Sequence, residues 1–231
     1  MKAVILQPSY IPWRGFFHQV QKAEIFVHYD CVQYDKHGWR NRNRIKTSQG
    51  SQWLTIPVVT KGCVKEGKII KDIEIPQNHS WSLKHYNSIK QSYTKSAFYK
   101  EILPLVEEIY SRKDKMLVDF TCSTTEMIAR KLGIQKTKFI RSSDICVTGS
   151  KTDRVIEILK KIGATHYISG PSAKDYIEKD KFADSGISLE FMSYDYTPYP
   201  QLHGIFEPRL SVLDLLFNLG FDAGKYIWGE K

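Results

Sequence analysis

Cysteine is scarce in this sequence, and long hydrophobic runs are missing. The 231 residues include only 4 cysteines, which are widely spaced and form no Cys-x-x-Cys pair. This spacing excludes the common zinc motifs and a disulfide framework, so we expect reduced thiols and assign no metal ligand. The apolar run Ala3–Leu6 is far shorter than the roughly 20 residues of a membrane span, and we expect a cytoplasmic protein without a signal sequence. The cysteines are Cys31, Cys63, Cys122 and Cys146.

Internal repeats and low-complexity segments are also missing. The hydrophobic content of 42% and the charged content of 26% lie near globular averages, which argues against disorder and a coiled coil. The length suits a single domain spanning 1–231. The net charge of +9 would attract nucleic acid, an anionic membrane surface or a phosphorylated small molecule alike. Most lysines alternate with acidic residues, and only the cluster Arg40–Arg44 stands apart.

The N-terminal residues have the pattern of a strand-helix-strand unit. Lys2–Leu6 is a short aliphatic run that ends before a proline, as a buried strand does. Trp13–Lys22 has apolar residues at helical spacing, and Ala23–Tyr29 predicts a second buried strand. We therefore expect two parallel strands joined by a helix.

Further elements alternate along the rest of the chain. The periodicity predicts a strand pair from two segments, two or three helices within Ser80–Leu132, and later strands and helices in alternation. This order favours an α/β fold, a mainly parallel Rossmann-like sheet with helices on both faces, carrying 80–133 as a mainly helical insertion. The other predicted segments are Gln52–Val59 paired with Lys71–Pro76, strands Lys138–Arg141, Ile145–Val147, Thr165–Ser169 and Ile187–Met192, and helices Ser150–Ile162 and Ser211–Leu219.

The turn after the first predicted strand is rich in polar, aromatic and proline residues. Ligands of parallel sheets bind outside the carboxyl ends of the strands, where this turn would emerge. Arg14, near a predicted helix start, could pair with phosphate or carboxylate in a catalytic site. Alternatively, Trp13 belongs to the core and Arg14 to the surface. The candidate binding residues here are Gln7, Ser9, Tyr10 and Trp13.

The turn after the second predicted strand combines acids, imidazoles, guanidinium groups and carboxamides. Asp30 or His28 could serve as a catalytic base, while Asp30 alternatively caps a turn. Aromatic residues interleaved with arginines are also typical of a platform for single-stranded nucleic acid. The candidate binding residues here are Gln33, Tyr34, Trp39, Arg42 and Asn43.

A third turn, Gly170–Asp175, follows a later predicted strand. Gly170 permits close approach of a ligand, Ser172 could cap a helix, and Lys174 adds charge. The turn predicts either a phosphate or carboxylate cradle or a plain helix cap.

The segment Gln7–Arg44 strongly resembles the WbqC-like protein family. The resemblance rests on Gln-Pro-Ser-Tyr-Ile-Pro-Trp-Arg-Gly-Phe-Phe, on Val-Gln-Tyr and on Trp-Arg-Asn-Arg-Asn, and later blocks extend it over nearly the whole chain. It implies a bacterial protein of O-antigen and related lipopolysaccharide biosynthesis. It further implies transfer of a glycyl or other aminoacyl group to a sugar, and it assigns no catalytic residue.

The order of elements is also similar in layout to pantothenate synthetase and other nucleotidyltransferases, which activate a carboxylate or phosphate with a nucleotide. The His-x-Gly-His signature of those enzymes is missing here. This similarity would fit ATP with magnesium as a cofactor.

Two functions follow as expectations. The first is an acyl or aminoacyl transferase, or a nucleotide-dependent ligase, acting on a nucleotide sugar or activated amino acid. The second is a non-catalytic module that binds a nucleotide or single-stranded nucleic acid through the Trp39–Arg44 segment. For the first we expect a small-molecule partner rather than nucleic acid, and oligomerisation stays open.

Overall fold

A five-stranded parallel sheet forms the centre of the protein in the computed structural model, which describes residues 1–59, 67–78 and 80–229. The strands lie in the order β5-β2-β1-β6-β7, and every neighbouring pair is parallel. The sequence-based prediction of an α/β Rossmann-like fold is therefore confirmed. The strands are β1 (Lys2–Leu6), β2 (Ile25–His28), β5 (Lys138–Arg141), β6 (His166–Ser169) and β7 (Ser188–Phe191).

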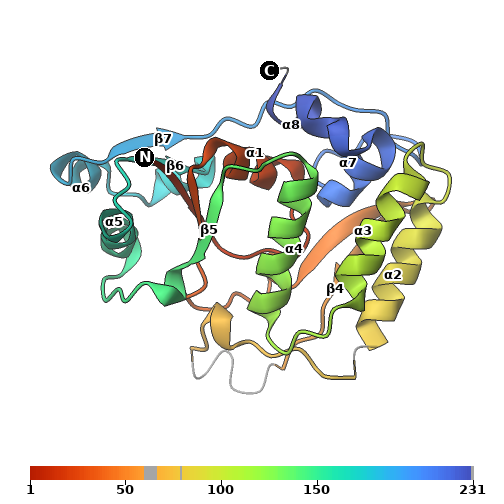
Figure 1. Cartoon of the computed structure of the whole chain (residues 1–231), viewed down its shortest axis with the longest axis horizontal. Coiled ribbons are helices and arrows are strands. Elements are labelled where there is room, and N and C mark those ends of the chain that lie inside the picture. Colours follow the sequence, from red (N-terminus) through yellow and green to blue (C-terminus); the bar gives the residue numbers. More distant parts are fainter. Residues whose placement is uncertain (60–66, 79, 230–231) are drawn as a thin grey trace.

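Helices cover both faces of this sheet (Figure 1). Val4 of β1 joins the core on the side of α1 (Arg14–Lys22) and α4 (Leu117–Lys131), whereas Ala3 and Ile5 join the core beneath α5 (Lys151–Lys161) and α6 (Lys179–Asp184). Successive residues of a strand point to opposite faces, so a strand that is apolar throughout can supply both cores.

A long connection between β2 and β5 contains a separate antiparallel ribbon. Its strands are β3 (Arg42–Thr47) and β4 (Gly50–Thr55), paired so that Arg44 lies opposite Trp53. The predicted strand pair of Gln52–Val59 with Lys71–Pro76 is wrong, because Gln52–Thr55 pairs with β3 and Ile70–Asp72 forms a 3-10 helix. The two segments share the backbone hydrogen bond from Val59 N to Glu74 O at 3.0 Å. The alternation in β3 was missed because its buried inward positions include the polar Asn43 beside Ile45.

Three helices follow the ribbon, as the periodicity predicted: α2 (Ser80–Tyr93), α3 (Tyr99–Ser111) and α4. Pro104 lies inside α3 and begins no helix. Side chains from all three join the same hydrophobic core as β1 and the ribbon. Near the C-terminus, Ser211 caps α7 (Val212–Leu219) by accepting from Leu213 N at 3.3 Å, and α8 (Lys225–Trp228) follows.

Two local predictions are wrong. Ile145–Val147 is not a strand; the 3-10 helix Ser142–Asp144 precedes it and extended chain leads to α5. After β6 the chain enters a 3-10 helix, Pro171–Asp175, whose N-cap is Gly170, so Ser172 caps no α-helix. Short segments of this kind give too little periodicity to separate a strand or helix from an ordered turn.

No helix among the described residues is long and apolar enough to cross a membrane. Cys31, Cys122 and Cys146 are free thiols, and Cys63 lies outside the described residues.

Candidate functional site

The strand order reverses between β1 and β6, and the turns after these two strands meet at the carboxyl edge of the sheet. Val4 pairs with Ile168, so continuing that register by two residues brings Leu6 level with Gly170. Gln7 and Gly170 therefore stand on the two sides of the switch point. Crevices at such reversals are the usual ligand sites of open parallel sheets.

The turn after β1 is fixed by the ribbon that packs on it. Tyr10 N donates to Trp39 O at 3.0 Å, and Asn43 Nδ2 donates to Tyr10 O at 3.1 Å and to Ile11 O at 2.7 Å. These bonds hold Ile11 at a φ of 36°, a conformation that a β-branched residue rarely adopts. Asn43, a predicted binding residue, is buried and serves this turn.

The side chain of Tyr10 is also buried and hydrogen-bonded inside the protein. Its hydroxyl contacts His85 Nδ1 at 2.8 Å and the Tyr110 hydroxyl, and its side chain is 1% exposed. Burial lowers the pKa of His85 to about 4, so at neutral pH the imidazole is uncharged and one of its nitrogens accepts a hydrogen bond. The network joins the β1 turn to α2 and α3, and it leaves no open face on the Tyr10 ring.

Arg14 anchors the C-terminal part of the chain. Its guanidinium donates to Thr197 O at 2.9 Å and to Tyr226 O at 3.0 Å, and it lies 4.7 Å and 5.2 Å from the ring centroids of Tyr196 and Tyr199. The residue is 3% exposed, and burial lowers its pKa. In this arrangement the guanidinium faces carbonyls and aromatic rings rather than a crevice.

Trp13 covers the first turn of α1. A Cβ placed on Gly15 would lie 2.3 Å from Cζ2 of the Trp13 indole, which shows how closely the ring lies on the glycine backbone. Arg14 and Gly15 are both buried, and since Gly15 has no side chain, its burial is that of its backbone. The amide donors of this turn are thus closed to an anion from solvent.

The indole of Trp13 belongs to an aromatic group that reaches Gly170. Its ring centroid lies 5.0 Å from that of Tyr194 and 5.8 Å from that of Tyr196, both edge-on. Tyr194 Oη accepts from Gln19 Nε2 at 2.5 Å and would lie 3.7 Å from a Cβ added to Gly170. Tyr194, which the sequence analysis did not single out, therefore borders the switch point.

Arg40 reaches the switch point from the ribbon side. Its Nη1 donates to Gln7 Oε1, while its buried Nε has no acceptor among the described residues. Burial lowers the pKa of Arg40 to about 10, against the opposing charges of Asp35 and Tyr34, so the group stays protonated at neutral pH. Arg40 is thus a cation that donates to a neutral amide at the carboxyl edge of the sheet, with the charge of Asp35 acting on it.

The ribbon presents a pair of exposed tryptophans next to Arg40. Trp39 and Trp53 are 42% and 45% exposed, and their ring centroids lie 5.4 Å apart with planes tilted by 32°. The guanidinium of Arg42 lies 4.6 Å from the Trp53 centroid and that of Arg44 lies 5.6 Å away. We call Arg40, Arg42, Trp39 and Trp53 the ribbon face.

The two predicted bases lie at the end of β2 and are both buried. Asp30 is fully buried and accepts from Ser142 Oγ at 2.9 Å, and from Ser143 N and Oγ at 2.8 Å each. His28 is 2% exposed, its ring packs on Phe139, and burial lowers its pKa to about 3. Both side chains join strand ends, and their catalytic role stays a prediction.

The remaining predicted residues are scattered. Ser9 is buried and donates to Gln7 O at 3.3 Å, and Tyr34 is buried with its N donating to Lys68 O. Gln33, Ser172 and Lys174 are exposed. The sequence signal that could have found the ribbon face is the spacing of Arg42 and Arg44, which places two cations on one side of β3, against the ring of Trp53.

Among residues 1–59, 67–78 and 80–229, no three histidine, cysteine or acidic side chains converge in a way that could hold a metal ion. Asp30 directs its oxygens to Ser142 and Ser143.

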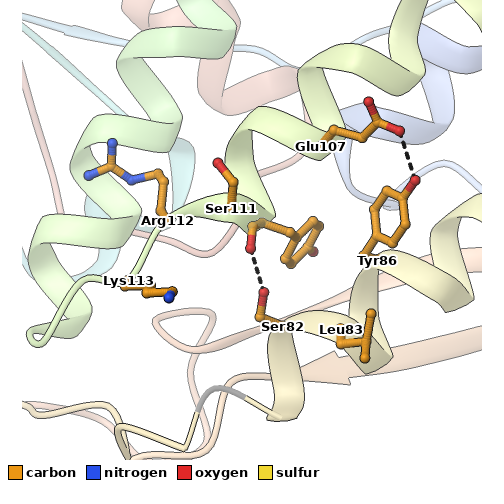
Figure 2. Close-up of a pocket in the computed structure, with 8 residues that line it drawn as sticks. Ser82, Leu83, Tyr86, Glu107, Ser111, Arg112 and Lys113 are labelled. Carbon is orange, nitrogen blue, oxygen red and sulfur yellow. Dashed lines mark hydrogen bonds between the residues drawn. The ribbon is translucent and has the colours of Figure 1, made fainter.

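A cavity of about 370 Å³ lies elsewhere, between α2 and α3 (Figure 2). Tyr86 Oη donates to Glu107 at 2.8 Å across it, and Ser82 Oγ donates to Tyr110 O at 2.6 Å. None of the predicted site residues lines this cavity. The cavity touches the β1 turn only through Tyr110, whose hydroxyl bonds Tyr10.

Comparison with known proteins gives one family and one relative. The profile of the WbqC-like protein family matches residues 7–226. The uncharacterized protein Rv1507c of Mycobacterium tuberculosis is 38% identical over 235 residues, which cover 98% of this chain and 97% of that protein. No solved structure matches the chain significantly.

Proposed function

This chain belongs to the WbqC-like protein family, and from that premise we propose that it is an enzyme of bacterial surface polysaccharide assembly. Family membership confirms the resemblance of the segment Gln7–Arg44. The reaction we propose is transfer of an acyl or aminoacyl group, such as glycyl, to a nucleotide sugar in the cytoplasm.

The observation that carries this proposal is the protonated Arg40 beside Gln7 at the reversal of strand order. Parallel sheets bind nucleotides and other anionic ligands at this point, and a guanidinium that donates to one neutral amide can still pair with an anion, although the charge of Asp35 also acts on it. Gly170 on the opposite side leaves room for close approach of a ligand.

The chemistry requires an activated carboxyl group. An amide or ester bond forms between the acyl carbon and an amine or hydroxyl of the sugar, while the bond from that carbon to a phosphate or thiol leaving group breaks with its electron pair. A base takes the proton of the attacking group. Asp30 and His28 would serve only if the buried end of β2 opened, so our proposal rests on ligand charge and position rather than on a named base.

A panel of ligands tests this function. Thermal unfolding should be measured with ATP and magnesium, acyl-coenzyme A, nucleotide sugars, glycine and a short single-stranded oligonucleotide, because a ligand of the folded state raises the melting temperature by mass action. Stabilising donors and acceptors are then combined, and mass spectrometry should show an acylated sugar. Failure of every donor and acceptor to stabilise the protein, with no product, would contradict the proposal.

A second candidate is a non-catalytic module that binds a nucleotide or single-stranded nucleic acid. The exposed Trp39–Trp53 pair with Arg42 beside it favours this function, since bases stack on aromatic rings and phosphates pair with arginine. Stabilisation by the oligonucleotide alone, falling steeply as salt is added, would support this candidate over the transferase.

A further inference from the structure

The usual phosphate site of a Rossmann-like fold is closed in this protein. In such folds the phosphates contact the first turn of the helix after β1, where free amides and the helix dipole attract anions. Here the Trp13 indole lies on Gly15, and the backbone of that turn is buried. Arg14 at the same helix end is bonded to two carbonyls. A phosphorylated substrate at the switch point must therefore find its positive charge elsewhere.

The cationic side chains on and next to the ribbon differ in the partners that they already have. Arg44 forms an ion pair with Glu207 at 2.7 Å, and Lys46 is 3% exposed and donates to Ile205 O at 2.5 Å. Arg40 and Arg42 instead hydrogen-bond Gln7 and a backbone carbonyl, and neither forms an ion pair among the described residues, although the charge of Asp35 acts on Arg40. These two arginines thus keep terminal nitrogens that no described carboxylate binds, whereas the guanidinium of Arg44 is paired.

The spacing of these two arginines suits linked phosphates. Arg42 is the first residue of β3 and Arg40 lies two residues before it in a bend, so their Cα atoms are at most about 7 Å apart. Each guanidinium carries five donors in a planar fork that matches phosphate oxygens. Neither has used more than one of its terminal nitrogens in the bonds described above.

The tryptophan pair limits what can accompany the phosphates. A ring inserted between two others needs them about 7 Å apart, twice the usual stacking distance, whereas the centroids of Trp39 and Trp53 are 5.4 Å apart. The pair can thus stack one planar group on its exposed side. A protein that binds single-stranded nucleic acid stacks successive bases on several aromatic rings. A single pair of rings therefore favours one nucleoside over an oligonucleotide.

We propose that the ribbon face binds the nucleoside diphosphate part of the substrate, with Arg40 and Arg42 on the phosphates and the Trp39–Trp53 pair under the base. This inference rests on the proposed function and names its substrate class. Gln7 holds Arg40 at the switch point, so the group attached to the outer phosphate would lie over the β1 and β6 turns.

Calorimetric titration with UDP, ADP, pyrophosphate and uridine tests the proposal on the full-length protein. UDP or ADP should bind, and Arg40→Gln and Arg42→Gln should each weaken binding of that nucleotide and of pyrophosphate at least tenfold. Trp39→Ala should weaken the nucleotide but leave pyrophosphate unchanged. Arg209→Gln, at an exposed arginine outside the ribbon face, is the matched control and should bind as wild type does.

Conservative variants keep the test valid if a glutamine variant fails to fold. Arg40→Lys and Arg42→Lys keep the charge but lose the planar fork, and they should recover only part of the affinity. Unchanged nucleotide affinity in both glutamine variants, each folded by circular dichroism, would overturn the ribbon-face assignment and leave the transferase proposal standing. No binding of any nucleotide or pyrophosphate by wild type would overturn both. Tighter binding of a thymidine oligonucleotide than of UDP would replace the single nucleoside with nucleic acid.

Discussion

The β1 turn and the ribbon face both combine aromatic side chains with arginine, yet they differ in how their polar groups are satisfied. In the turn, Tyr10 and Arg14 are buried, and the Tyr10 hydroxyl and the Arg14 Nη1 meet defined partners on α2, α3 and the C-terminal segment. On the ribbon face, Trp39 is exposed, and Arg40 and Arg42 hydrogen-bond Gln7 and a backbone carbonyl without an ion pair among the described residues. The polar groups of the turn thus stabilise the fold, whereas those of the ribbon face keep donors available for the ligand that we propose.

The comparison of the β1 turn with the ribbon face shows that a dense set of polar and aromatic residues is not by itself evidence of a binding site. Buried polar groups are costly unless each finds a partner, so a turn packed against three elements needs many such residues for stability alone. The criterion for a ligand site is the surplus of charge and donors that the protein itself does not use. The predictions below test whether the two regions can be separated in this way.

The largest expected effect is from Arg14→Ala. Removing the guanidinium leaves the carbonyls of Thr197 and Tyr226 without their donor and two aromatic rings without their cation. We expect the free energy of unfolding in urea to fall by about 3 kcal/mol, while the folded fraction keeps its nucleotide affinity. Arg209→Ala, at an exposed position, is the control and should stay within about 0.5 kcal/mol of wild type. A folded Arg14→Ala protein of normal stability that no longer binds nucleotide would return Arg14 to the ligand site.

Acid should weaken the turn through His85. Burial lowers the pKa of His85 in the folded protein from 6.5 to about 4. Above pH 6.5 the ring is neutral in the folded and in the unfolded protein, so its titration does not change stability there. As the pH falls from 6.5 towards 4, the unfolded protein binds the proton first and the folded protein loses stability. At pH 5 the loss is about 2 kcal/mol from this one group. Urea unfolding of His85→Gln at pH 8 and pH 5 should show a pH difference smaller than that of wild type by this amount. An unchanged difference would mean that the imidazole is charged and paired in the folded protein.

Asn43→Ala should have a smaller effect on the same turn. The variant loses two hydrogen bonds to Tyr10 O and Ile11 O, and with them the restraint on the positive φ of Ile11. We expect the free energy of unfolding to fall by about 1.5 kcal/mol, measured in urea. Asn87→Ala on the exposed side of α2 is the matched control and should be neutral or slightly stabilising. Equal losses in both variants would show that Asn43 does not hold the turn.

Much of the fold could be predicted from the sequence, because the buried parallel strands and amphipathic helices have distinct periodicities. Lys2–Leu6, Lys138–Arg141 and the helix of Ser150–Ile162 are examples, each found within about a residue of its observed bounds. The ribbon was missed because recognising β3 required knowing that Asn43 and Ile45 face inward, which only its packing on the β1 turn decides. A local sequence pattern cannot predict which face of a strand is buried when packing against a distant segment decides it.

The candidate site was less predictable for a related reason. The segments Gln7–Gly15 and Trp39–Arg44 both stand out by composition, but nothing in their residue types says that Trp13 closes the helix start or that Glu207 neutralises Arg44 and not Arg42. Which cations remain free depends on residues more than a hundred positions away.

Arg42→Gln should have the smallest effect on stability and therefore tests the comparison most directly. The Arg42 side chain makes a partly exposed cation–ring contact with Trp53. A contact of this kind at an exposed site stabilises a protein by about 0.5 to 1 kcal/mol. We expect the free energy of unfolding to change by no more than this, measured beside Arg14→Gln, which makes the same chemical substitution in the buried turn. A loss at Arg42 as large as that at Arg14 would mean that the ribbon arginines also serve the fold, and the surplus of charge from which we infer a ligand would not exist.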